Sequence, residues 1–227
     1  MAARIHLTAA DEFSTRLYGL LGERKGIYTV GSISIGSIDK EDIAPWSLTR
    51  DQFDVPFDEF ILGTVHPETE RPEVNSQLIE ILLEAIGLGV GEGYKFIFTG
   101  SNCDVYGDEY NAALQALAVS NPESVFFIQN FGRSGYFSAL RQCTCVFGNT
   151  SSGILEAASF GKFVVNVGER QRGRLRSRNV RDVGFNSVEM FDALREVSQL
   201  GNFRGHNVYS RPDTVQEILK IIKNDHF

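Results

Sequence analysis

The chain has 227 residues with a formal net charge of −7; 42% of its residues are hydrophobic and 22% are charged. These values are ordinary for a globular protein, and the acidic balance argues against general affinity for nucleic acid. No stretch approaches the roughly 18 consecutive apolar residues of a membrane helix, and the first residues lack the apolar core of a signal peptide. We therefore expect no membrane partner and no secretion.

The three cysteines, Cys103, Cys143 and Cys145, do not form a disulfide pattern, and two of them fall on one predicted strand. They indicate reduced core residues, so we expect a cytoplasmic protein. A Cys-x-Cys metal site is the alternative interpretation of the pair.

The N-terminal part is predicted to form a short strand at 5–8, a helix at 9–21 and a second strand at 27–30. The segment up to residue 57 is less periodic, and its prolines indicate a loop or a short helix.

From residue 58 onward strands and helices alternate with short connections, which predicts an α/β fold with a Rossmann-like parallel sheet and helices on both faces. The strands are expected at 59–65, 94–98, 124–128, 143–147 and 163–167. The helices are expected at 72–86, 106–119, 133–141, 187–198 and 214–223.

Ligands of such sheets bind beyond the carboxyl ends of the strands. The loops that begin there carry polar side chains, so groups from five loops are expected to meet at one edge. They are His66, Asn102 with Asp104, Asn130 with Arg133, the run 148–153, and the run 169–174.

The run Gly-Asn-Thr-Ser-Ser-Gly at 148–153 lies between a predicted strand and a predicted helix, which favours an anion site. The first N–H groups of a helix have no intrahelical partner, glycine admits close approach, and the hydroxyls of Ser151 and Ser152 add donors. Glu156, placed in the first turn, can bind two ribose hydroxyls. The alternative is a helix cap without a ligand.

The strand 163–167 opens into an arginine-rich loop, and this pairing favours the anion site. Arg170, Arg172 and Arg174 can add charge-assisted bonds to a diphosphate. Six arginines within residues 170–181 of an acidic chain suit a small polyanion better than a long one, although a nucleic-acid-contacting loop is an alternative.

His66 follows a buried strand directly and precedes a proline, where an imidazole can contact a phosphate or move a proton. The alternative is a histidine satisfied by local backbone. Glu68 and Glu70 are candidate acid–base carboxylates, or simply the acidic first turn of the following helix.

The remaining candidates have structural alternatives as well. Asn102 and Asp104 can contact sugar hydroxyls, or they can be turn formers. Arg133 and Tyr136 can flank a base, or they can extend across the surface.

The segment GNTSSGILEAASFGKFVVNVGERQRGR at 148–174 closely resembles the signature of the hydrolysing UDP-N-acetylglucosamine 2-epimerases, the UDP-releasing enzymes that begin sialic acid synthesis. Four upstream segments resemble the family in order and spacing. They are VGSISIGSID (30–39), TVHPET (64–69), FTGSNCD (98–104) and NFGRSGYFSAL (130–140). The glutamate and arginines of ERQRGR (169–174) separate this branch from the non-hydrolysing epimerases.

The resemblance implies one domain of a glycosyltransferase-B-like fold, with UDP in the C-terminal domain and no metal or other cofactor. It also implies anti elimination of UDP from UDP-GlcNAc to a 2-acetamidoglucal, followed by hydration to N-acetylmannosamine. On matching positions, Ser151, Ser152 and Gly153 hold the diphosphate, Glu156 binds the ribose, and Asn149 belongs to the UDP and substrate site. His66 contacts phosphate near the reacting centre with Arg170 beside it, and Asn102, Asp104, Arg133 and Arg174 complete the substrate site.

Two departures limit the resemblance. The family's chain is longer, so we expect residues 1–227 to be its C-terminal domain, with the carboxylates that handle the C2 proton in a missing N-terminal domain. The chain alone is then expected to turn over poorly. The usual Tyr-Gly-Asp-Gly turn is replaced by NVYSRPD at 207–213, and the helix in 214–227 is expected to pack toward the missing domain.

Three functional questions stay open at this point. A glycosyltransferase of the same fold and a non-enzymatic nucleotide-sugar-binding module are the alternatives to an epimerase. The sequence does not distinguish UDP from GDP, nor one 2-acetamido sugar from another. Members of the family often form homodimers, and the oligomeric state is not fixed by these residues.

Overall fold

The computed structural model describes residues 3–36, 38, 43–69, 72–101 and 106–224. The chain divides into two compact units, one formed by residues 1–41 with 206–227 and the other by residues 42–205. The assignment of residues 1–227 to one domain of a longer enzyme stays a prediction.

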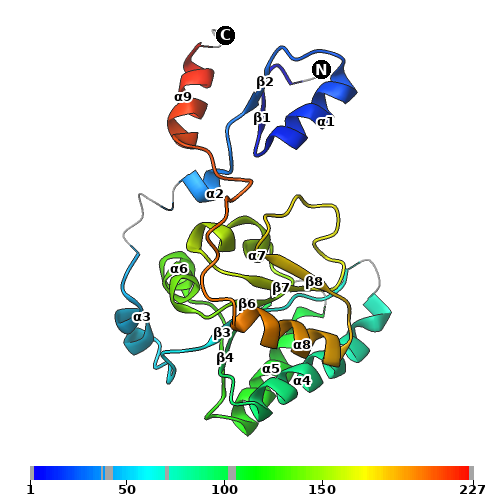
Figure 1. The fold of residues 1–227 in the computed structure, drawn as a ribbon, viewed down its shortest axis with the longest axis vertical. Helices are drawn as coiled ribbons and strands as arrows, with labels where there is room; N and C mark the ends of the chain where they lie inside the picture. Colours follow the sequence, from blue (N-terminus) through cyan, green and yellow to red (C-terminus); the bar gives the residue numbers. More distant parts are fainter. Residues whose placement is uncertain (1–2, 37, 39–42, 70–71, 102–105, 225–227) are drawn as a thin grey trace. The chain divides into compact units, whose positions relative to one another are not determined.

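The larger unit contains a six-stranded sheet in the order β5-β4-β3-β6-β7-β8, and all of its neighbouring strands are parallel (Figure 1). Its strands are β3 (Ile61–Thr64), β4 (Phe96–Thr99), β5 (Val125–Ile128), β6 (Val146–Gly148), β7 (Val164–Val167) and β8 (Val180–Val183). This is the predicted Rossmann-like sheet.

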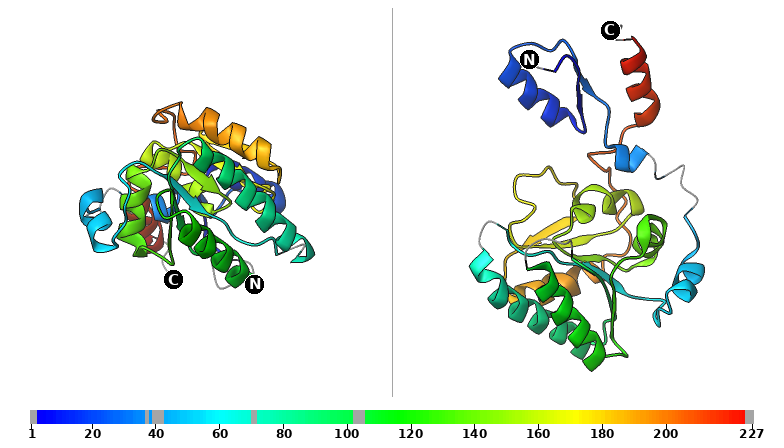
Figure 2. Two further views of the ribbon diagram at one scale, coloured as in Figure 1. Left: turned by 90° about the horizontal axis from the view of Figure 1, so that it is seen from below. Right: turned by 180° about the vertical axis from the view of Figure 1, so that it is seen from behind.

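Helices cover both faces of this sheet (Figures 1 and 2). One face carries α4 (Asn75–Gly91), α5 (Gly107–Ser120) and α8 (Ser187–Ser198), and the other carries α3 (Trp46–Gln52), α6 (Gly132–Gln142) and α7 (Ser151–Leu155). Two 3₁₀ turns, η2 (Pro72–Val74) and η3 (Ala157–Phe160), adjoin α4 and α7.

The strands are apolar on both sides because both faces are covered. Ile61 and Phe98 pack into the core cluster with Leu82 of α4, whereas their neighbours Leu62 and Ile97 are equally buried. Side chains alternate between faces along a strand, so a strand buried on both sides reads as a continuous apolar run.

Helix α4 with its preceding 3₁₀ turn, Pro72–Gly91, is long and apolar enough by length and composition alone to cross a membrane. In the structure its Leu82, Ala85 and Ile86 lie in the core cluster and are almost fully buried. Its apolar character is therefore used in packing against the sheet and α8.

The smaller unit contains a two-stranded parallel sheet, β1 (His6–Thr8) with β2 (Ile27–Thr29). Its helices are α1 (Asp11–Leu21), α2 (Ile33–Gly36) and α9 (Thr214–Asn224). Leu219 and Ile222 of α9 are about half exposed. The prediction that the C-terminal helix packs toward a further domain stays a prediction.

Helix α3 is the short helix that was one of the two alternatives for its segment. Three details of the structure differ from the sequence expectation. Helix α4 continues to Gly91 rather than ending at residue 86. Strand β6 begins at Val146, so Cys143 and Cys145 precede it, buried and unpaired. Strand β8 was not expected, because its charged centre, Arg181-Asp182, hides the apolar pattern at the edge of the sheet.

Candidate functional site

The order of strands makes the carboxyl ends of β3 and β6 the switch point of the sheet. These strands are neighbours, but the chain continues from β3 to β4 on one side and from β6 to β7 on the other. Ligands of open parallel sheets bind at such switch points. His66 follows β3 and the run 149–153 follows β6, so the two central candidate segments meet there.

Asn149 joins these two segments. Its side-chain Oδ1 accepts the backbone N–H of His66 at 2.7 Å, and its Nδ2 donates to the backbone carbonyl of His66 at 2.8 Å. Both residues are buried. Its side chain thus holds the histidine loop in place, and the predicted contact of Asn149 with the ligand stays a prediction.

Gly148 allows this close approach. Its φ is +126°, and a Cβ at this position would lie 2.1 Å from the carbonyl oxygen of Thr64. Only glycine combines that backbone conformation with the absence of a side chain.

A second asparagine holds the other side of Pro67. Asn75 Oδ1 accepts the backbone N–H of Glu68 at 2.8 Å, and its Nδ2 donates to the Glu68 carbonyl at 3.0 Å. The expectation that Glu68 lies in the first turn of the next helix was wrong, because α4 begins only at Asn75. Glu68 is instead buried, and its Oε1 has no hydrogen-bond partner within the described residues. Glu70 lies outside them.

The run after β6 forms both a cap and a hydroxyl-lined turn. The Thr150 hydroxyl accepts the Ser152 N–H at 3.3 Å, so the capping interpretation is confirmed for Thr150. The Ser152 hydroxyl is buried and lies against the hydroxyl of Tyr136 on α6. Gly153 lets α7 approach β7, since a Cβ there would lie 3.0 Å from Val164.

The helix after this turn is shorter than predicted. It spans five residues, Ser151–Leu155, and continues as the 3₁₀ turn η3. Glu156 is therefore the C-cap residue that follows α7 rather than part of a long helix's first turn, and it is buried. A helix of this length contributes little dipole, so any anion must be held by individual N–H, hydroxyl and guanidinium donors.

The loop after β7 converges on Asn149 from the other side. Gln171 Nε2 donates to the Asn149 carbonyl at 2.7 Å, and an amine of the Arg170 guanidinium lies 3.4 Å from the same oxygen. Gln171 is almost fully buried, yet its Oε1 has no partner among the residues described. Sequence reasoning missed Gln171 because an amide among arginines gives no signal by itself.

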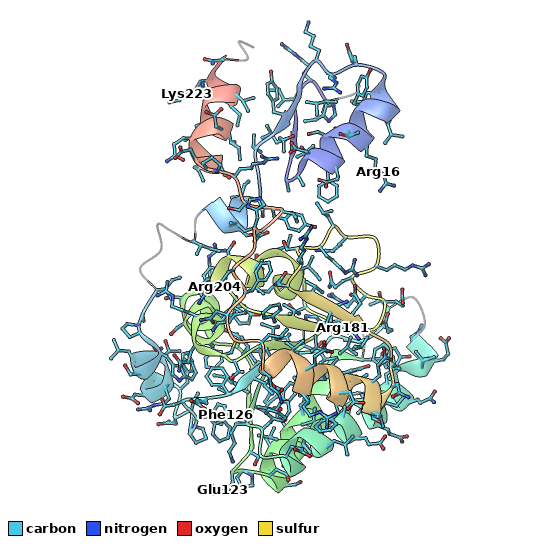
Figure 3. All side chains as sticks on the ribbon, viewed as in Figure 1. Arg16, Glu123, Phe126, Arg181, Arg204 and Lys223 are labelled. Carbon is cyan, nitrogen blue, oxygen red and sulfur yellow. The ribbon has the colours of Figure 1, made fainter. Side chains whose placement is uncertain are left out.

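The arginines of this loop do not act alike. Arg176 bonds to the carbonyl of Gln171 at 3.0 Å and pairs with Asp182 at 2.9 Å, so it anchors the loop. Arg174 is exposed, and Arg181 lies on β8 rather than in the loop (Figure 3). The cationic side chain nearest Asn149 is that of Arg170.

Two residues of α6 were also candidates. The Tyr136 hydroxyl is buried beside the hydroxyls of Ser152 and Thr64, and burial raises its pKa well above the ordinary value. The Arg133 guanidinium lies 4.9 Å from the ring centre of Phe137, which agrees with a side chain extended across the surface. The predicted contacts of Asn102 and Asp104 lie outside the described residues.

The polar atoms at this edge suit an anion. Ser152 offers a hydroxyl, Tyr136 a phenol and Arg170 a guanidinium. A cavity of about 350 Å³ lies at the carboxyl ends of β7 and β8, lined by Glu169, Arg172 and Asp182 among others. Within the ranges that the structure describes, no group of three or more His, Cys, Asp or Glu side chains is placed to hold a metal ion.

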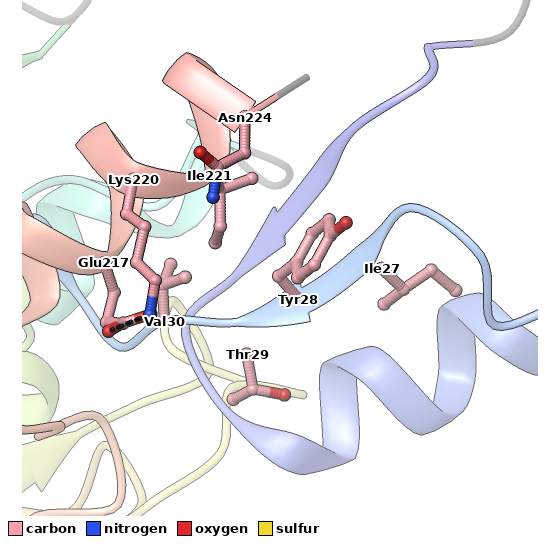
Figure 4. A pocket seen from close by; sticks show the side chains of 8 residues that line it. All are labelled: Ile27, Tyr28, Thr29, Val30, Glu217, Lys220, Ile221 and Asn224. Carbon is pink, nitrogen blue, oxygen red and sulfur yellow. Dashed lines mark ion pairs between the residues drawn. The ribbon is translucent and has the colours of Figure 1, made fainter. Parts of the chain in front are cut away.

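A larger cavity of about 530 Å³ lies in the smaller unit, between β2 and α9 (Figure 4). Tyr28 and Ile221 line it, and Lys220 and Glu217 form an ion pair of 3.7 Å across one end. None of the predicted site residues lies in it.

The fold and this edge define a parallel α/β domain of the glycosyltransferase-B type, and comparisons with known proteins agree. The S. aureus MnaA–UDP co-structure matches 97% of this chain and 59% of that chain, with a TM-score of 0.74 and 14% identity. The M. jannaschii UDP-GlcNAc 2-epimerase in complex with UDP-GlcNAc and UDP matches with a TM-score of 0.71 and 14% identity, covering 97% of this chain and 61% of that chain.

The sequence comparisons identify the family. Residues 1–223 match the model of the UDP-N-acetylglucosamine 2-epimerase family, so the chain belongs to that family. The predicted membership and fold class are thereby confirmed.

Curated relatives show how much of the family's chain is matched. One is the GDP/UDP-N,N'-diacetylbacillosamine 2-epimerase (hydrolyzing) of Campylobacter jejuni, 29% identical over 82% of this chain and 48% of its own length. Another is the polysialic acid biosynthesis protein P7 of Escherichia coli, 28% identical over 98% of this chain and 57% of its own length. The chain thus spans about half the length of these relatives and matches their C-terminal half.

Proposed function

We propose that this chain is the nucleotide-binding half of a hydrolysing UDP-N-acetylglucosamine 2-epimerase, with UDP bound at the edge where β3 and β6 end. The observation that carries the proposal is a set of polar atoms buried at that edge: Gln171 Oε1, which has no partner among the described residues, and the hydroxyls of Ser152 and Tyr136, which lie against each other. Buried polar groups are normally satisfied, so such a concentration favours a polar ligand.

The residues then have distinct roles. Ser151, Ser152 and Gly153 bind the diphosphate through hydroxyl and N–H groups, and Arg170 neutralises its charge. Arg174, being exposed, can reach the ligand from the rim. Glu156, although buried at the end of α7, keeps the proposed contact with the ribose. Asn102, Asp104 and Arg133 are assigned to the sugar or the base.

The proposed reaction begins with loss of the C2 proton to a base while the bond between C1 and the diphosphate oxygen breaks. UDP leaves with the bonding electrons, and a 2-acetamidoglucal forms. Water then adds across the double bond to give N-acetylmannosamine. The proposal assigns the C2 base to the half of the relatives' length that this chain does not match, so the chain alone should turn over poorly.

Titration of UDP-GlcNAc into the purified chain tests the site. We expect saturable binding that weakens about tenfold or more in Ser152→Ala, because a hydrogen bond to a charged group contributes about 1.5–3 kcal/mol. Ser138→Ala is the matched control. The hydroxyl oxygen of this serine of α6 is buried, like that of Ser152, and has no partner among the described residues, but the side chain points away from the side on which Tyr136 lies.

Product analysis of the same mixtures distinguishes the reaction classes. Slow release of UDP and N-acetylmannosamine supports the epimerase. Transfer of the intact sugar to an acceptor would indicate a glycosyltransferase, and release at an enzyme-like rate would contradict the assignment of the base to another part of the enzyme.

A further inference from the structure

The imidazole of His66 has a specific neighbour that the proposed function does not use. Its Nδ1 lies 3.1 Å from the hydroxyl oxygen of Ser101, in the loop after β4. Both side chains are buried, with 5% of His66 and 4% of Ser101 exposed, so this contact is shielded from solvent.

Ser101 is itself fixed in place. Its backbone N–H donates to Oδ1 of Asn111 on α5 at 2.7 Å. The histidine backbone is held equally firmly by Asn149, as described above. The relative position of imidazole and hydroxyl is therefore set, before any ligand arrives, by the loop after β4, by helix α5 and by the segment after β6.

The hydrogen bond between these two groups can run in either direction, and the two directions are not equivalent. Within the described part of the chain, the only hydrogen-bond partner of the Ser101 hydroxyl is His66 Nδ1. If Nδ1–H donated to the serine, the hydroxyl proton would be buried without an acceptor among the described residues, which costs about 1–3 kcal/mol. If the serine donates to an unprotonated Nδ1, the hydroxyl is satisfied.

We propose that Ser101 is a positioning residue that holds His66 as the neutral tautomer with its proton on Nε2. The ring nitrogen that does not face Ser101 then carries an N–H group. Which nitrogen of a histidine is protonated is set by the bond that the other nitrogen makes.

This tautomer decides between the two roles open to His66. An Nε2–H group is a donor, so it stabilises an anionic oxygen and does not accept a proton from carbon. This part rests on the proposed function: the anionic oxygen would belong to the diphosphate, whose charge grows as its bond to C1 breaks. His66 is then a donor to the leaving group and not the C2 base.

The tautomer is measurable without any substrate, from the ¹⁵N resonances of the histidine side chains in the labelled chain. The chain has four histidines, and the spectrum of His66→Gln identifies the signals of His66 by their loss. We expect a pyrrole-type Nε2 and a pyridine-type Nδ1 near neutral pH. A pyrrole-type Nδ1 in the unsubstituted chain would overturn the inference.

Substitutions at Ser101 test its role directly. Ser101→Thr keeps the hydroxyl and should preserve the tautomer, whereas Ser101→Ala should give a mixture of the two tautomers. Ser138→Ala should leave the spectrum unchanged. A Ser101→Ala chain that folds and keeps a pure Nε2–H tautomer would show that Ser101 does not set it.

Addition of UDP separates this inference from the proposed function. We expect UDP to move the Nε2 signal, and we expect Ser101→Ala to weaken UDP binding about fivefold, the loss of roughly one ordinary hydrogen bond. If the tautomer is as predicted but UDP leaves the signal unmoved, the Ser101 assignment stands and the proposed phosphate contact fails.

Discussion

The most informative substitution for the architecture of the site is Asn149→Ala. It removes the two bonds of 2.7 and 2.8 Å that hold the backbone N–H and carbonyl of His66. Because His66 is buried, both groups would be left without partners. Each such loss costs about 1–3 kcal/mol, so the free energy of unfolding should fall by roughly 2–6 kcal/mol.

Urea denaturation, monitored by the fluorescence of Trp46, measures this change in the unit of the fold that contains Asn149 and His66. Trp46 is the single tryptophan of the sequence, belongs to the unit of residues 42–205, and is buried against Phe60 at a ring-centre distance of 4.8 Å. Asn130→Ala is the control, because it removes one exposed bond, to the Gly132 N–H, and should cost less than about 1 kcal/mol.

Asn149→Asp adds a pH-dependent version of the same experiment. The new carboxyl still accepts the His66 N–H, but its second oxygen replaces a donor that lies 2.8 Å from a carbonyl oxygen. Ionisation is therefore disfavoured in the folded state, so the pKa of the carboxyl rises above the ordinary value of about 3.9. The variant should approach wild-type stability as the pH falls toward 4 and lose it as the pH rises. A loss below about 1 kcal/mol in Asn149→Ala, or a pH-independent gap in Asn149→Asp, would refute the reasoning.

Three further predictions follow from the same packing. Gly148→Ala should cost more than the roughly 1–2 kcal/mol that positive φ costs at Gly173→Ala, where no atom would lie within 4 Å of the new Cβ; urea midpoints compare them. Burial raises the pKa of Cys143 to about 12, and it raises the pKa of Cys145 as well. The stability that comes from keeping these thiols protonated is therefore fully present below the unfolded thiol pKa of about 8.5. It should fall by about 1.4 kcal/mol per pH unit for each thiol as the pH rises above that value, and Cys145→Ala should halve the slope of stability against pH. Arg176→Ala should raise the Kd for UDP about three- to tenfold with little change in Tm, because it frees the loop at Gln171 while breaking only a partly exposed ion pair; an unchanged Kd in calorimetry would contradict the anchoring role.

Much of the fold could be predicted from local patterns. Helix α8 was predicted at its observed limits, since Asn186 caps it by accepting the Glu189 N–H and its apolar residues recur at helical spacing. Strand β8 was missed because an edge strand with two charged residues lacks the apolar run of a buried one. The early end of α7 was missed because apolar spacing does not distinguish an α-helix from a 3₁₀ turn over so few residues.

The site was predictable in position but not in its internal contacts. His66 and the run 148–153 were expected at one edge, and the sheet order brings them together. The clamp between Asn149 and His66 joins residues 83 positions apart, and the Ser101 contact joins residues 35 positions apart, so no local pattern reports them. The same long range explains why the positioning role of Asn149 was not predicted.

The most direct test of the central claim, that this edge binds UDP, is a calorimetric titration of UDP into the chain and into Arg170→Ala. Arg178→Ala serves as the control, because Arg178 is an exposed arginine in the loop that leads to β8. We expect saturable binding that Arg170→Ala weakens about tenfold or more and Arg178→Ala leaves unchanged, since a charge-assisted bond contributes about 1.5–3 kcal/mol. Equal affinity in all three proteins, or no binding at millimolar UDP, would contradict the account.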